Sequence, residues 1–201
     1  MTDKSLKNVL IVDDEVTWHE VLKKRFGDYE KKADCPYRFR VDTASSAAEG
    51  IQMFRQKTRQ NSQYEVIVLD IRMETPEAGL DACFGVGMQL RDDLPVIIFL
   101  TGYGSNESCV RAIRNGAWDY TTKEDVGDRF AAQVVVDSAA DRLQELDLRR
   151  SYADVVASWL PEHLGRLQTE YGGHIVALWR EDDGLRVVAS GVDAFDLARA
   201  L

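Results

Sequence analysis

The sequence predicts an α/β protein with a doubly wound, five-stranded parallel sheet, an extended fifth helix and a small C-terminal α+β unit. Two observations lead to this prediction. Apolar runs alternate with amphipathic segments five times along the chain, and short connections in such a pattern are typical of parallel sheets with right-handed crossovers. The length of 201 residues is sufficient for one well-cored domain and a smaller one.

Five segments are predicted strands. Continuous apolar runs at 9–12, 66–69 and 96–100 have the pattern of strands that are buried on both faces, so we expect them at the centre of the sheet. The segments 39–43 and 118–122 are rich in β-branched and aromatic residues and are predicted as the two edges.

Helical spacing of apolar residues predicts a helix after each of the first four strands, over about residues 15–31, 46–58, 82–92 and 106–116. Ser105 is a suitable N-cap for the last of these helices, and Gly116 is a suitable stop. The segment 74–86 begins with residues that break any regular pattern, including Pro76, so we expect an enlarged loop there.

The fifth helix is predicted to be unusually long, because apolar residues recur at helical spacing from 125 to about 150. Such a domain needs a shorter helix, so the surplus is expected to extend beyond the sheet. Leu143 and Leu146 belong to this apolar stripe, which extends over too few heptads to predict a coiled coil. A homodimer through this helix or through the tail is therefore left open.

The tail is predicted as a small helix-hairpin-helix domain. Pro161 suits the first turn of a helix that ends near Tyr171. The runs 174–179 and 185–190 are strand-like and predict a hairpin, after which Asp193 can cap a last helix. We therefore expect three parts, namely a main domain at 1–140, a helical extension and linker at 141–160, and the small domain at 161–201.

Composition narrows the classes of function. The formal net charge is -9, and residues 125–201 carry 8 basic and 14 acidic side chains and no lysine. Nucleic-acid binding depends on clustered Lys and Arg, so no nucleic-acid partner is expected. No apolar run approaches the roughly 20 residues that span a bilayer. We see no signal peptide either, and therefore expect a cytoplasmic protein without membrane contact.

Polar residues close the predicted central strands, and two more lie within or just after the last strand. Because the carboxyl ends of parallel strands meet at one edge of a sheet, where ligands bind, we expect these side chains to lie close together. They are Asp13, Asp14, Asp70, Thr101, Tyr120 and Lys123.

The acids among these residues indicate a metal site and a nucleophile. A cluster of carboxylates repels itself unless a divalent cation lies among them, and such oxygen ligands suit Mg²⁺. Asp70 ends the central strand and is the candidate nucleophile toward phosphorus, as in proteins that form an aspartyl phosphate. Asp13 and Asp14 would hold the metal ion beside it, and the backbone carbonyl of Arg72 could complete the set of ligands.

The remaining polar residues suit the handling of a phosphoryl group. Lys123 can pair with Asp70 or with a phosphoryl oxygen as a point charge. Thr101 can donate its hydroxyl, and Gly102 leaves room for the group to approach. If Thr101 moves toward the phosphoryl group, the ring of Tyr120 can turn into the vacated space, which would be a two-state switch.

Each of these residues also has a simpler interpretation. Asp13 and Asp14 can cap the first helix, since Asp is preferred at helix N-termini. Asp70 and Thr101 can be turn residues at strand ends. Tyr120 can be an ordinary aromatic residue of an edge strand. These interpretations stay open for each residue taken alone, whereas the combination of all these positions favours the acidic pocket.

Four short motifs stand in register along the first part of the chain. They are Val-Asp-Asp-Glu at 12–15, Leu-Asp-Ile-Arg-Met at 69–73, Leu-Thr-Gly-Tyr-Gly at 100–104 and Gly-Ala-Trp-Asp-Tyr-Thr-Thr-Lys at 116–123. In this order they resemble the receiver domain of bacterial two-component response regulators over about residues 6–140. The resemblance implies a flavodoxin-like fold with strand order 2-1-3-4-5. It also implies that Asp13 and Asp14 hold Mg²⁺ and that Asp70 accepts a phosphoryl group.

By the same resemblance, Thr101 and Tyr120 act as a switch, and Lys123 senses the phosphate. The donor would be a histidine kinase or a phosphotransfer protein, and the expected output is altered protein association. Such a protein releases no separate product, so we do not expect an enzyme. Two alternatives stay open. The chain can be a phosphate sink or relay with a passive tail, or, with less support from its acidic tail, a DNA-binding regulator.

The chain departs from the family pattern in two places. Glu124 stands where the family usually has proline, and Met-Glu-Thr-Pro-Glu-Ala-Gly at 73–79 replaces the usual loop after the phosphoacceptor. We therefore expect unusual contacts in this loop. Residues 171–201 resemble, more weakly, a small domain family of unknown function.

Overall fold

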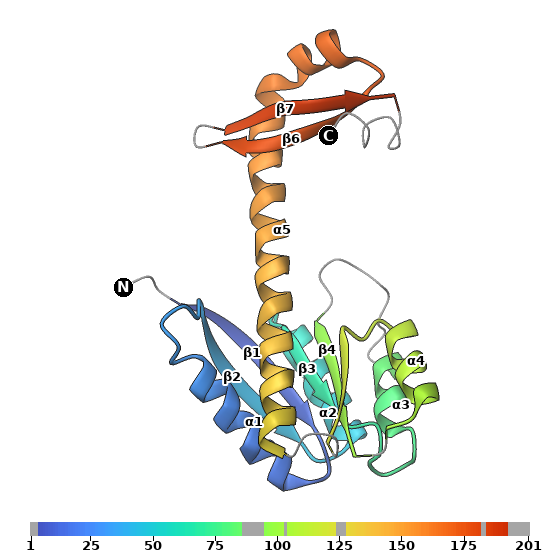
Figure 1. Cartoon of the computed structure of the whole chain (residues 1–201). Helices are drawn as coiled ribbons and strands as arrows, with labels where there is room; N and C mark the ends of the chain where they lie inside the picture. Colours follow the sequence, from blue (N-terminus) through green and yellow to red (C-terminus); the bar gives the residue numbers. More distant parts are fainter. Residues whose placement is uncertain (1–3, 86–94, 103, 124–127, 182–183, 193–201) are drawn as a thin grey trace. The chain divides into compact units, whose positions relative to one another are not determined.

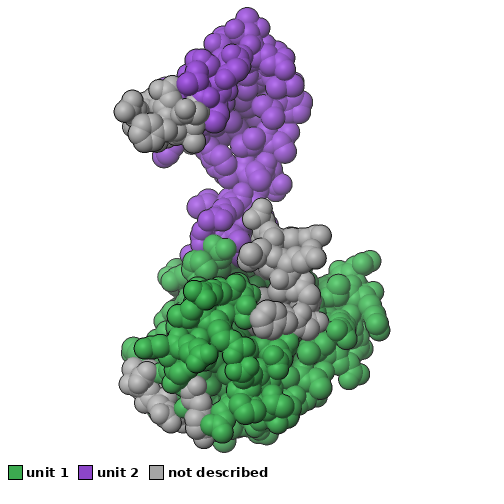
Figure 2. All heavy atoms as spheres, turned by 90° about the vertical axis from the view of Figure 1, so that its right-hand side faces the viewer, with its two compact units in different colours: residues 1–143 green, residues 144–201 purple. Residues whose placement is uncertain are grey.

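The computed structural model describes residues 4–85, 95–102, 104–123, 128–181 and 184–192 (Figure 1). The chain forms two compact units, residues 1–143 and residues 144–201, which Figure 2 shows in different colours. Helix α5 (Asp128–Tyr171) contributes residues to both units. The finer division into three parts stays a prediction.

Unit 1 (residues 1–143) contains the predicted five-stranded parallel sheet, in the predicted order β2-β1-β3-β4-β5. Its strands are β1 (Ser5–Val12), β2 (Tyr37–Ala44), β3 (Val66–Leu69), β4 (Val96–Thr101) and β5 (Asp119–Thr122). Every residue of β3 and β4 is buried, as expected for strands covered on both faces.

Strand β1 begins four residues earlier than the apolar run, because Ser5 pairs with Tyr37 at the start of β2. The polar Lys7 fits within this extension. Its side chain is buried, and its ammonium lies 5.0 Å from the centre of the Tyr37 ring. The long aliphatic stem thus covers apolar surface while the charge meets an aromatic face.

Four helices connect these strands, namely α1 (Val16–Tyr29), α2 (Ala47–Arg59), α3 (Ala78–Gly85) and α4 (Asn106–Arg114). One face of the sheet packs against Phe54 of α2, Leu80 of α3 and Ala112 of α4. The predicted cap and stop of α4 are both confirmed. Ser105 is the N-cap and accepts from the Ser108 N–H, and Gly116 adopts a φ of 90°.

The prediction for the segment after β3 was wrong in part. We expected an enlarged loop over 74–86 and a helix only from about 82, but α3 begins at Ala78. Thr75 and Pro76 form the turn before the helix, in which the Ala78 N–H donates to the Thr75 carbonyl at 3.3 Å. The expected remainder of the helix after Gly85 lies outside the described residues, and so does Glu124.

The prediction of a separate helix from Pro161 was also wrong, because α5 is one helix of 44 residues that runs through this proline and ends at the predicted Tyr171. A proline inside a helix removes one backbone hydrogen bond and bends the axis, but it does not have to end the helix. Figure 1 shows such a change of direction in the last part of α5.

Unit 2 (residues 144–201) contains the predicted hairpin, formed by the antiparallel strands β6 (Ile175–Glu181) and β7 (Gly184–Gly191). The Tyr152 hydroxyl of α5 donates to the Leu178 carbonyl of β6. The last helix predicted from Asp193 lies outside the described residues. Among the helices that the structure describes, none is long and apolar enough to cross a bilayer.

Candidate functional site

The sheet continues for one residue beyond three of its strands, and this fixes the backbone of the predicted site residues. The Asp70 N–H donates to the Val12 carbonyl at 2.9 Å, and the Lys123 N–H donates to the Thr101 carbonyl at 2.8 Å. The Asp13 N–H donates to the carbonyl at the end of β2 at 3.0 Å. The carboxyl edge of the sheet therefore holds these residues side by side, as their positions after apolar runs predicted.

Lys123 lies at the centre of this group. Its ammonium nitrogen is 2.8 Å from an oxygen of Asp13, 2.8 Å from Oδ2 of Asp70 and 2.9 Å from Oε1 of Glu15. Only 6% of its side chain is exposed. Burial lowers the pKa of Lys123, but the hydrogen bonds that it donates to Asp13 and Asp70 outweigh this effect and raise the pKa above its ordinary value. The lysine therefore stays charged.

Three carboxylates form a potential metal site beside the lysine. One ligand oxygen each from Asp13, Asp14 and Asp70 lies within 4.8 Å of the others, with Asp13 and Asp70 buried and Asp14 exposed. Burial raises the pKa of Asp13 to about 6, although hydrogen bonding to Lys123 lowers it. Together with Glu15, the pocket has four acidic side chains and one ammonium, so acidic groups are in excess. Such a set of oxygen donors fits a divalent cation such as Mg²⁺.

The predicted ligand Arg72 contacts Asp70 through its backbone. Its N–H donates to Oδ1 of Asp70 at 3.2 Å, while Oδ2 of Asp70 accepts from Lys123. Both carboxylate oxygens of Asp70 are thus oriented by donors. The role of the Arg72 carbonyl as a metal ligand stays a prediction.

Thr101 and Gly102 lie next to this pocket at the end of β4. Thr101 is fully buried. Among the described residues, a Cβ atom added to Gly102 would meet only Cδ of Lys123, at the ordinary contact distance of 3.8 Å. The space in front of Gly102 is therefore bounded by the stem of Lys123.

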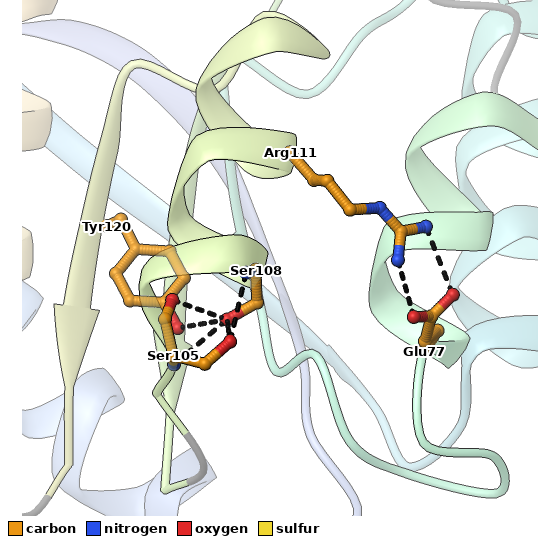
Figure 3. A network of polar contacts seen from close by, with 5 residues as sticks. All are labelled: Glu77, Ser105, Ser108, Arg111 and Tyr120. Atoms are coloured by element: carbon orange, nitrogen blue, oxygen red, sulfur yellow. Dashed lines mark hydrogen bonds and ion pairs between the residues drawn. The ribbon is translucent and has the colours of Figure 1, made fainter.

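Tyr120 is placed differently from the other predicted residues. It contacts α4 rather than the acids, because its hydroxyl lies 2.9 Å from the Ser108 hydroxyl (Figure 3). Ser108 also completes a capping box with Ser105 at the first turn of α4. The ring is half-buried against the core of unit 1. Tyr120 thus links β5 to the N-terminal turn of α4.

Sequence reasoning missed three residues at the start of α1, one of which is its N-cap. Glu15 is the N-cap residue and makes no side-chain capping bond, but it accepts from Lys123. His19 is buried and its Nε2 lies 2.8 Å from the Asp13 carbonyl. The Trp18 ring lies 5.2 Å from the Lys123 ammonium. The acids do not act as the N-cap of α1, although an oxygen of Asp13 accepts from the Glu15 N–H at 2.9 Å.

Comparison with known proteins identifies the family. The response regulator receiver domain matches residues 9–134 of this chain. The chain belongs to this family. The acid tolerance regulatory protein ActR of Rhizobium meliloti is similar to this receiver protein, with 33% identity over 129 residues, which are 64% of this chain and 58% of that protein. The two-component response regulator ARR11 of Arabidopsis thaliana is 31% identical over 115 residues, 57% of this chain and 19% of that protein.

Solved receiver domains share the fold. A CheY-like receiver domain protein from Methanospirillum hungatei has a TM-score of 0.52 at 23% identity, over 70% of this chain and 99% of that one. A receiver domain from Clostridium thermocellum has a TM-score of 0.51 at 24% identity, over 70% of this chain and 98% of that one. These likenesses support the fold alone. The chain spans less than two thirds of the two curated relatives named above.

Membership in the family has direct consequences for the acidic pocket. Receiver domains are signalling domains that are phosphorylated on an aspartate and bind Mg²⁺ in an acidic pocket, and they interact with histidine kinases or phosphotransfer proteins. In this receiver domain the buried acids at the carboxyl edge of the sheet form a pocket of that kind.

Proposed function

We propose that this protein is a response regulator that accepts a phosphoryl group on Asp70 in the presence of Mg²⁺. The observation that supports this most directly is the position of the Asp70 carboxylate. It is buried, it accepts from Lys123 at 2.8 Å, and it lies among further carboxylates that suit a divalent cation. A carboxylate in this setting is oriented toward one reaction.

The chemical step is an in-line transfer to Asp70. One oxygen of Asp70 forms a new bond to phosphorus while the bond from phosphorus to the donor breaks, and the electron pair of that bond leaves with the donor group. With a phosphohistidine donor, a P–N bond breaks and the imidazole leaves. Asp13, Asp14, Asp70 and the backbone carbonyl of Arg72 would hold a Mg²⁺ ion, which would neutralise charge on the phosphoryl group.

Three further groups of the chain assist this step. The Lys123 ammonium pairs with a phosphoryl oxygen, and the Thr101 hydroxyl donates to another one. Gly102 leaves room for these oxygens, since a Cβ there would meet only the lysine stem. As Thr101 moves toward the phosphoryl group, the Tyr120 ring turns inward and leaves Ser108, and this changes the surface that the protein offers to partners.

The donor partner is a histidine kinase or a phosphotransfer protein, which also follows from the resemblance of the receiver domain. The output is altered association of this protein with a partner or with a second copy through α5 or the tail. Size-exclusion chromatography with and without beryllofluoride, which mimics the phosphoryl group, tests this output. An unchanged elution volume together with unchanged partner capture would contradict it.

The central test is incubation with acetyl phosphate and Mg²⁺, followed by intact mass measurement. We expect the wild type to gain one phosphoryl group and Asp70→Asn to gain none. Asp28→Asn is the matched control, because Asp28 is an acid on the surface of α1 that pairs with Lys31. Removal of Mg²⁺ with EDTA should also abolish the gain. A phosphoryl group on Asp70→Asn at the wild-type level would refute the proposed function.

A further inference from the structure

The loop between β3 and α3 is tightly joined to the backbone of the phosphoacceptor. The Gly79 N–H donates to the Ile71 carbonyl at 2.9 Å. A Cβ atom added to Gly79 would lie 1.9 Å from the carbonyl oxygen of Asp70 and 2.9 Å from the Cα atom of Ile71. Because the first turn of α3 touches the Asp70 backbone, a displacement of this loop would be felt at Asp70.

Two glutamates of this loop bind two different helices. The Glu74 carboxylate accepts from the backbone N–H groups of Ala47 and Ala48, at 3.3 and 3.4 Å, and so contacts the first turn of α2. The Glu77 carboxylate forms a two-point ion pair with the Arg111 guanidinium of α4, in which Nη2 and Oε2 are 3.0 Å apart (Figure 3). Two-point pairs of this kind restrict orientation as well as distance.

The Arg111 contact and the Tyr120 contact involve the same helix. Ser108 and Arg111 are three residues apart in α4, so their side chains are neighbours on the helix surface. Ser108 contacts Tyr120 of β5, and Arg111 contacts Glu77 of the loop (Figure 3). Helix α4 is therefore held both to the strand that carries Tyr120 and to the loop that follows Asp70.

We propose that Glu77 and Arg111 are positioning residues whose ion pair holds α4 where Ser108 contacts Tyr120, and so opposes the switch. This inference rests on the proposed function, in which Tyr120 leaves Ser108 when Asp70 is phosphorylated. A contact made in one of two arrangements shifts the population toward that arrangement. Loss of the ion pair therefore favours the switched arrangement and the phosphoryl transfer that is coupled to it.

The size of the effect follows from exposure. The side chains of Arg111 and Glu77 are 37% and 51% exposed, so solvent weakens their attraction. Hydrogen bonds from Arg111 hold the pKa of Glu77 below its ordinary value, and the pair therefore stays ionised at neutral pH. We expect each single substitution to change the measured rates by about two- to fivefold.

Hydrogen exchange of the full chain tests the positioning itself. Glu77→Gln should speed the exchange of amides in α4, and Arg111→Gln should speed exchange in the loop 73–79. In each variant, the exchange is therefore measured in an element other than the one that carries the substitution. Arg114→Gln is the matched control, because Arg114 is an exposed arginine on the same helix with no ion pair among the described residues. If Glu77→Gln leaves exchange in α4 unchanged, the inference is overturned.

The rate of phosphoprotein formation from acetyl phosphate tests the consequence for the site. Glu77→Gln and Arg111→Gln should each increase this rate by about two- to fivefold, and the double variant should be no faster than either single one. The charge-swapped variant E77R/R111E should return to the wild-type rate, which a merely structural defect would not do. Wild-type rates in both single variants, or a swap that restores nothing, would refute the inference.

The two proposals fail in distinguishable ways. A wild-type protein that takes up no phosphoryl group would refute the proposed function, and the exchange experiment would then decide the positioning role alone. A wild-type protein that is phosphorylated at the same rate as all the variants would refute only the role of the ion pair.

Discussion

The two units of this protein differ in how completely their strands are covered. In unit 1, every residue of β3 and β4 is buried, and Phe99 is 0% exposed. In unit 2, the buried apolar residues that the structure describes on the hairpin are Leu185 and Ala189, whereas the Trp179 side chain is 63% exposed. A sheet between helices holds side chains at its edge in fixed positions. A two-stranded hairpin is marginal without support from another element. The predicted site residues all lie in unit 1.

Core truncation should show the largest difference between the units. Phe99→Ala removes a fully buried ring and should lower the free energy of unfolding of unit 1 by about 3–5 kcal/mol. Trp179→Ala removes a larger side chain of unit 2, but most of it is in solvent, so we expect a change of less than about 1 kcal/mol. Urea denaturation combined with hydrogen exchange separates the two units. Equal losses would contradict the difference in coverage.

Glycine substitutions sharpen the same comparison. A methyl group at Gly79 would collide with the backbone of Asp70, so Gly79→Ala should destabilise unit 1 by about 1–3 kcal/mol and slow phosphorylation. Gly165 lies inside α5 in unit 2, and a Cβ there meets nothing within 4 Å. Gly165→Ala should therefore stabilise unit 2 by about 0.5–1 kcal/mol. The two effects are read as opposite shifts of the unfolding midpoint, and shifts in the same direction would contradict this prediction.

A metal ion should stabilise one unit and not the other. Because the proposed Mg²⁺ site lies in the folded pocket of unit 1, a Mg²⁺ concentration of about ten times Kd should add about 1.4 kcal/mol to the stability of unit 1. Thermal unfolding of the wild type should shift upward with Mg²⁺, whereas that of Asp13→Asn should not. Asp81→Asn, which changes an exposed acid of α3, is the control and should respond as the wild type does. An equal shift in Asp13→Asn would place the ion elsewhere.

The same contrast explains which features could be predicted from the sequence. The central strands are continuous apolar runs because both faces are covered, and the polar residues at their ends meet because parallel strands share an edge. Local chemistry was also sufficient for Ser105 and Gly116, whose roles at the ends of α4 depend on adjacent backbone. Each of these features depends on a short stretch of sequence, and it can therefore be predicted from the sequence alone.

The features that were not predicted depend on contacts between distant segments. Glu77 and Arg111 are 34 residues apart, and nothing in either segment shows that they meet. His19 stands alone in the sequence, and its role is visible only once α1 places it on the Asp13 carbonyl. The path of α5 through Pro161 was missed because proline is favoured in the first turn of a helix, whereas inside a helix it is tolerated only with a bend.

A comparably small effect is expected from the contact between α5 and the hairpin of unit 2. Tyr152→Phe removes the hydroxyl that donates to the Leu178 carbonyl and should cost unit 2 about 1 kcal/mol. Tyr171→Phe is the matched control, because the Tyr171 hydroxyl makes no hydrogen bond among the described residues. Amide exchange in β6 should be faster in Tyr152→Phe and unchanged in the control. Few apolar side chains of the hairpin are buried. One hydrogen bond therefore contributes a larger fraction of the stability of β6 than it would in β3, which is buried throughout. If exchange in β6 is unchanged, the hairpin is stable without this contact with α5. The two units then differ less in stability than the burial of their strands indicates.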